Sequence, residues 1–243
     1  MKIVYIIIGL LLISLVGIAQ SSVFYSREEL TKLLNEEVQK EINWVRQDPE
    51  RYRNMIKVEG RLDLKRYQSE GNRKWFIMEK SKYYESKETT HEGVSAYREM
   101  DKFLKHQKTL LVYTYEKSLR AEAKKQCEYI FRSGNFSHDR PDGKGLSYVK
   151  KLKGEGLMLV GEVLAKLDNK ITSGEYNKTE LNTQIRAIAQ EIVIGWIVDD
   201  GIPKRGHRSA IFHEQHKYFG AYCLIDEKGT VICAVEFSTL PME

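Results

Sequence analysis

The stretch from Glu191 to Gly220 constrains the fold of this 243-residue chain more than any other. Apolar residues lead into it at three- and four-residue steps, the period of a helix that buries one face. They are Ile185, Ile188, Ile192 and Trp196. Two adjacent carboxylates, Asp199 and Asp200, end this predicted helix, and Gly201 and Pro203 are typical of the turn after it.

A histidine follows this turn. The tripeptide Gly206-His207-Arg208 lies a few residues beyond Asp200, and a predicted strand begins soon after it. A helix that ends in carboxylates beside a short loop with a histidine brings acid and imidazole groups close enough to share a proton or a metal ion. This stretch is therefore the first candidate for a functional site.

Composition limits the class of protein. With 42% hydrophobic residues, the chain can build a sizeable core as one domain of about 200 residues or as two small ones. The net charge of +5 is small, and Lys and Arg are interspersed with Asp and Glu. Because a nucleic-acid-binding surface needs its cations gathered on one face, we expect no nucleic-acid partner.

Residues 1–20 have the pattern of a signal peptide. Lys2 is followed by an apolar run from Ile3 to Val16, and Gly17 and Ala19 belong to a small-residue cleavage pattern. The run is shorter than the roughly 20 residues of a membrane span. We therefore expect a secreted or periplasmic protein with no integral membrane span after cleavage, and an uncleaved anchor is the alternative.

Apolar periodicity divides the rest of the chain into three parts. Residues 21–56 are predicted to hold a long amphipathic helix that Pro49 interrupts. Residues 57–90 have little periodicity and are predicted to be a solvated basic insertion. Charged side chains in such a loop are usually only hydrated and bind no partner. Residues 91–243 are predicted to hold two further helices, the helix described above and strands near 157–165, 218–225 and 230–238.

Glu162 is the second clue to a site. It lies in an apolar run short enough for a buried strand, on the same face as Val160 and Leu164. An unpaired buried carboxylate costs several kcal/mol, so we expect Glu162 to have a cationic or hydrogen-bonding partner. The alternative is that the strand reaches the surface at this point.

The candidate site residues are His138, Glu162, Asp199 or Asp200, and His207. Two imidazoles and two carboxylates suit Zn²⁺ or another divalent cation, and they equally suit acid–base chemistry near neutral pH. Each histidine on its own could equally be structural. A second pair, His213 and His216, is spaced by three residues instead of the four of the zinc-protease motif, so we interpret that segment as surface.

The three cysteines are too few to staple a small secreted domain. Cys127 lies on the apolar side of a predicted helix, where a buried thiol is expected. Cys223 and Cys233 flank the hairpin signal Asp226 to Gly229 and face each other across it. A disulfide and two packed thiols are both compatible with this pairing.

Three motifs in order give the chain a resemblance to the CAP superfamily of cysteine-rich secretory, antigen 5 and pathogenesis-related group 1 proteins, in particular its bacterial SCP-like branch. They are Ser137-His138 followed by Asp142-Gly143, the run Gly161-Glu162-Val163-Leu164-Ala165, and Gly206-His207-Arg208 after Trp196. The resemblance implies an α+β fold, a three-layer α/β/α sandwich with a mostly antiparallel sheet. It also implies a central cleft lined by His138, Glu162 and His207, with Asp199 where the family often has Glu.

The function that the resemblance implies is a secreted binding protein whose cleft holds a divalent metal, with lipid, glycan or protein as partner. The alternative is a metal-assisted hydrolase in which Glu162 or the Asp199–Asp200 pair activates water. A third hypothesis makes the cleft a structural hydrogen-bond network and gives partner contacts to the 57–90 insertion.

Overall fold

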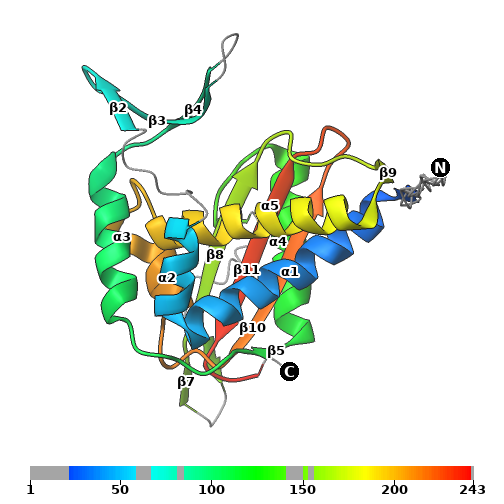
Figure 1. Cartoon of the computed structure of the whole chain (residues 1–243). Helices are drawn as coiled ribbons and strands as arrows, with labels where there is room; N and C mark the ends of the chain where they lie inside the picture. Colours follow the sequence, from blue (N-terminus) through cyan, green and yellow to red (C-terminus); the bar gives the residue numbers. More distant parts are fainter. Residues whose placement is uncertain (1–21, 59–66, 81–84, 141–149, 153–155, 242–243) are drawn as a thin grey trace, which may run out of the picture.

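The computed structural model describes residues 22–58, 67–80, 85–140, 150–152 and 156–241, and it shows an α+β domain (Figure 1). The α+β prediction is therefore confirmed. The predicted signal peptide, residues 1–20, lies outside the described ranges. No described helix combines the length and the apolar character that a membrane span needs.

Four strands form the central sheet in the order β5-β10-β11-β8. Their bounds are Thr114–Tyr115 (β5), Val160–Leu167 (β8), Tyr218–Ile225 (β10) and Val231–Ser238 (β11). The β10, β11 and β8 strands pair antiparallel, while the short β5 runs parallel to β10. The β11–β8 register places Glu162 opposite Glu236, which sets the surroundings of both carboxyl groups.

Helices cover both faces of this sheet (Figure 1). On one face lie α1 (Arg27–Gln47) and α5 (Lys178–Val198), and on the other lies α4 (Lys117–Ser133). Side chains alternate between the two faces along each strand. Val163, Cys233 and Val235 therefore join the core under α1 and α5, and Leu164, Ile232 and Ala234 pack against α4.

The apolar stripe predicted for the helix before Asp199 is confirmed in α5. Its four residues are at most 4% exposed, and they are Ile185, Ile188, Ile192 and Trp196. The indole Nε1 of Trp196 donates to the Leu164 carbonyl at 2.8 Å, so this buried donor is satisfied. The stripe thereby fixes α5 to β8 and places Asp199 at the end of the helix.

The long N-terminal helix breaks where Pro49 predicts. Helix α1 begins with a capping box in which Ser26 and Glu29 satisfy each other's backbone N–H groups. It ends before Asp48, and Pro49 occupies the first position of α2 (Pro49–Val58), where its missing N–H is not needed.

Residues 67–80 and 85–89 form a three-stranded antiparallel sheet that we call the extension. Its strands are β2 (Tyr67–Glu70), β3 (Arg73–Lys80) and β4 (Glu85–Thr89). It projects away from the domain beside the start of α3 (Val94–His106) (Figure 1). The sequence did not predict these strands, because its mixture of Lys, Arg, Tyr and Glu lacks a clear two-residue alternation.

The remaining elements are short. Strand β1 (Val23–Tyr25) pairs with β9 (Gly174–Tyr176), and β6 (Lys150–Leu152) pairs with β7 (Gly156–Met158). A 3-10 turn (Pro203–Arg205) leads into α6 (Gly206–Ile211).

The three cysteines lie where the sequence places them. Cys127 is fully buried on the inner face of α4. Cys223 lies opposite Cys233 across the β10–β11 hairpin, and their sulfur atoms are within bonding distance.

Candidate functional site

His138 is held by a buried carboxylate. Helix α4 ends at Gly134, whose left-handed φ of 68° turns the chain into the loop that carries His138. The buried Gln126 anchors this loop, since its amide donates to the Ser137 carbonyl. The Nδ1 atom of His138 lies 2.6 Å from Oε1 of Glu162. The predicted partner of Glu162 is therefore this imidazole.

The two members of this pair differ in exposure. The His138 side chain is 45% exposed and that of Glu162 is 2% exposed. The hydrogen bond from Glu162 raises the pKa of His138, and burial opposes this effect. Because a carboxylate accepts at Nδ1, the tautomer with Nδ1–H is favoured and Nε2 is left to meet a ligand.

A second carboxyl group, Glu236, lies behind Glu162. It is 1% exposed and faces Glu162 across the β11–β8 ladder. Burial, then the charge and hydrogen bond of Glu162, raise the pKa of Glu236 well above its ordinary value. Glu236 therefore holds its proton more tightly than an ordinary glutamate. The sequence analysis missed it, although the signal that identified Glu162, an acid in an apolar strand, is also present here.

His207 is held in the same manner by Asp199. Its Nδ1 lies 2.7 Å from Oδ1 of Asp199, while the second oxygen of Asp199 accepts the backbone N–H groups of His207 and Arg208 at 2.8 and 3.2 Å. The Asp199 side chain is fully buried and the His207 side chain is 17% exposed. Three donors on one carboxylate fix both the ring and the loop that carries it.

The two imidazoles face each other. Their ring centroids are 6.3 Å apart and their planes are inclined by 40°. Zn²⁺ binds imidazole nitrogen at about 2.0–2.1 Å, so one ion can lie between two rings at roughly this separation. Histidine that binds a metal through one nitrogen commonly donates the other N–H to a carboxylate, the arrangement that both rings have here.

The protein ligands available for a metal ion are few. Within the described residues, no group of three or more His, Cys, Asp or Glu side chains is arranged to hold an ion. The carboxylates of Glu162 and Asp199 are engaged with the Nδ1 atoms of the histidines. Among the described residues, a metal ion at this place would have only His138 and His207 as protein ligands, and water would have to fill its other positions.

Comparison with protein families decides the relationship. A sequence model of the CAP family, described as the cysteine-rich secretory protein family, matches residues 92–237, which is more than half of the chain. The chain belongs to this family. No curated protein and no solved structure matches it.

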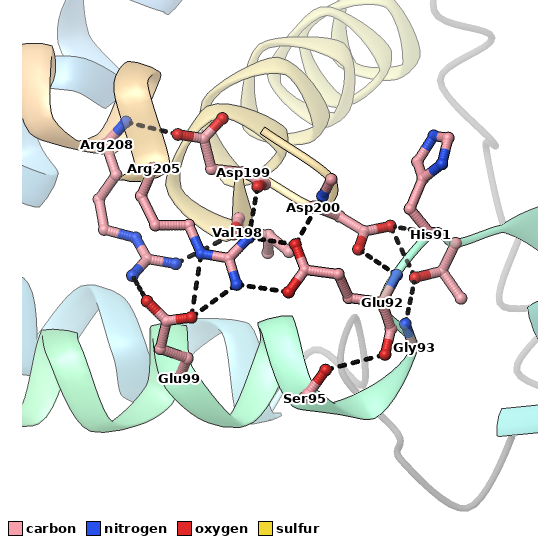
Figure 2. Close-up of polar contacts among 12 residues, drawn as sticks. His91, Glu92, Gly93, Ser95, Glu99, Val198, Asp199, Asp200, Arg205 and Arg208 are labelled. Carbon is pink, nitrogen blue, oxygen red and sulfur yellow. Dashed lines mark hydrogen bonds and ion pairs between the residues drawn. The ribbon is translucent and has the colours of Figure 1, made fainter. Parts of the chain in front are cut away.

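The CAP match contains both histidine–carboxylate pairs and leaves the extension outside it. Of the adjacent acids that the sequence offered, only Asp199 reaches a histidine ring. Asp200 turns the other way and binds the segment between the extension and α3 (Figure 2). The motif residues His138, Glu162, Asp199 and His207 thus converge in the CAP domain, and Asp200 does not join them.

The interpretation of residues 213–216 as a surface segment is wrong for His216. This side chain is 5% exposed, and its ring is parallel to Phe237 and stacked on His213. Burial is the main cause that lowers the pKa of His216 to about 4. The short-range pattern could not show this, because Phe237 comes from a distant strand.

Proposed function

We propose that this CAP-domain protein is secreted and that it binds one divalent metal ion, Zn²⁺ first among them, between His138 and His207. The signal-peptide pattern of residues 1–20 supports secretion. One observation carries the metal proposal: each imidazole donates Nδ1–H to a buried carboxylate while the rings face each other at 6.3 Å. This orients both rings, and in a neutral imidazole bonded in this way Nε2 carries the lone pair that a borderline cation needs.

Binding, instead of catalysis, is the function that this arrangement supports best. A metal held by two side chains and water presents exchangeable positions to an outside donor group, such as a carboxylate of a lipid, glycan or protein partner. The 45% exposure of His138 gives a partner access to the ion from one side. The fully buried Asp199 keeps His207 fixed on the other side.

Calorimetric titration of the mature protein with Zn²⁺ tests the proposal. We expect His138→Ala and His207→Ala each to weaken binding at least about a hundredfold, because each removes one of two protein ligands. Asp199→Asn keeps the ligands but removes the oriented carboxylate, and such changes typically cost about 10–100-fold in metal affinity.

The second histidine pair supplies the control. His213 stacks on His216 at 4.3 Å between ring centroids, and its Nδ1 accepts the backbone N–H of Gln215 in place of a bond to a carboxylate. His213→Ala should therefore leave Zn²⁺ affinity unchanged. Equal affinity of the wild type and the His138→Ala/His207→Ala double variant would reject the metal site.

A metal-assisted hydrolase is the second candidate, and the Glu162–Glu236 pair favours it. Two carboxyl groups in contact, one of them with a raised pKa, are an arrangement that acid–base enzymes use. In this reaction Glu162 would activate water and a histidine would donate to the leaving group. Turnover of a peptide library by the wild type, lost in Glu162→Gln, would support hydrolysis, and no turnover by the Zn²⁺-loaded wild type would reject it.

A further inference from the structure

The loop that carries His207, residues 199–207, has an unusual backbone. Asp199, Lys204 and Arg205 have φ values of 57°, 58° and 53°, and Asn169 is the one other non-glycine residue with positive φ in the described chain. The left-handed conformation is unfavourable for an L-residue because Cβ comes too close to the following carbonyl oxygen. Such residues persist only where surrounding contacts hold them. The contacts that hold this loop therefore also hold His207.

Arg205 supplies most of these contacts (Figure 2). Its guanidinium forms a two-point fork with the Glu92 carboxylate and donates twice to Glu99 Oε2, at 2.9 and 2.6 Å. The same group donates to the Asp199 carbonyl at 2.8 Å. One side chain thus joins both ends of the left-handed stretch to the start of α3.

Two further features support this cluster. Hydrogen bonds from Arg205 and from the Gly201 N–H lower the pKa of Glu92 to about 2. Arg208, whose side chain is 4% exposed, donates to Glu99 at 3.0 Å and to the Val198 carbonyl at the end of α5. The loop is therefore bound to α3 and α5 at the same time.

Asp200, in the same loop, binds residues 90–92, which join the extension to α3 and which we call its base (Figure 2). Its carboxylate accepts the Thr90 hydroxyl at 2.7 Å and the backbone N–H groups of His91 and Glu92 at 2.6 and 2.8 Å. Lys74 on β3 donates to the His91 carbonyl at 3.1 Å. The extension and the His207 loop consequently share one polar cluster.

We propose that Arg205 is a positioning residue for His207, and that Asp200 couples the extension to the metal site by binding its base to the same loop. The proposal rests on the function assigned to His207 above. Removing either side chain should let the left-handed stretch relax, and the Nδ1–H bond to Asp199 should weaken with it. A partner that moves the extension would alter the same bond.

The test uses the metal-free full chain with ¹⁵N-labelled histidine, so that it does not depend on metal binding. Imidazole NMR signals report whether His207 and His138 keep Nδ1–H bonded to their carboxylates. In Arg205→Gln and in Asp200→Asn we expect the His207 signal to shift or broaden and that of His138 to stay. Zn²⁺ affinity, measured separately, should fall about tenfold in both variants.

Arg53 offers a matched control, since its guanidinium forms a comparable fork with Asp101 on α3 without touching the loop. Arg53→Gln should change neither histidine signal. Should Arg205→Gln fail to fold, Arg205→Lys keeps the charge but not the fork and should give a smaller shift in the same direction.

An unchanged His207 signal in a folded Arg205→Gln protein would overturn the positioning role. If Asp200→Asn disturbs the backbone amide signal of His91 but leaves the His207 imidazole signal unchanged, the coupling to the extension is refuted. Absence of Zn²⁺ binding by the wild type would overturn the proposed metal site and leave the NMR result to decide the positioning role.

Discussion

Acidification should destabilise this CAP domain through the buried imidazole of His216. The ring lies parallel to Phe237 with centroids 5.8 Å apart, and its Nδ1 is 3.3 Å from the Ala210 carbonyl. Burial, helped by the nearby charges of His213 and Arg46, lowers its pKa to about 4. An unfolded chain, where histidine has a pKa of about 6.5, binds the proton much earlier.

The sign and size of the effect follow from this difference. Between pH 6.5 and pH 4 the unfolded state binds more protons than the folded state, so stability falls as the pH falls. The contribution of His216 is complete above about pH 6.5. With a folded pKa of about 4, the loss is about 2 kcal/mol at pH 5 and approaches about 3 kcal/mol at pH 4.

Urea unfolding followed by tryptophan fluorescence, from pH 7.5 to pH 4.5, measures this loss. His216→Gln removes both the titrating group and the ring that packs on Phe237, so the variant should be less stable than wild type at pH 7.5. The difference from wild type should then shrink by about 2 kcal/mol by pH 5. His91→Gln removes an exposed imidazole and is the control. Parallel stability curves for wild type and His216→Gln between pH 6.5 and pH 5 would refute the reasoning.

Two further predictions concern the sheet and its cysteines. Gly220→Ala should cost more than about 4 kcal/mol in urea unfolding, because an added Cβ would overlap the backbone at the start of α4. Gly195→Ala, in open space on α5, should instead stabilise by about 0.5–1 kcal/mol, and equal effects would contradict this packing. Alkylation of the unfolded, non-reduced protein should modify Cys127 alone, since Cys223 and Cys233 pair across the hairpin. Adducts on all three cysteines in the mass spectrum would show that Cys223 and Cys233 are free thiols.

The predictions that succeeded rest on short-range regularities. The three- and four-residue spacing before Asp199 identified α5, and Pro49 and Gly134 marked helix ends that the structure confirms. Glu162 was informative for an energetic reason: an acid on a buried strand requires a partner, and the structure supplies His138.

The features that the sequence did not predict depend on contacts between distant segments. Glu236 matters only because the β11–β8 register sets it against Glu162. Asp199 and Asp200 are adjacent and chemically alike, and the left-handed conformation of Asp199 sends one to His207 and the other to His91. Periodicity and composition do not distinguish two such neighbours, since the difference arises from the loop that follows them. Only the resemblance to the CAP superfamily singled out Asp199.

The two halves of the histidine pair are held by different means, and this decides where the site is sensitive. Glu162 is fixed by the ladder that β8, an edge strand of the central sheet, forms with β11, so the position of its partner His138 depends on the sheet. Asp199 lies at a helix end in a strained loop, so His207 depends on ion pairs made by Arg205 outside the site. Changes in the sheet core should therefore cost folding and site together, whereas changes in the ion pairs can alter the site in a protein that remains folded.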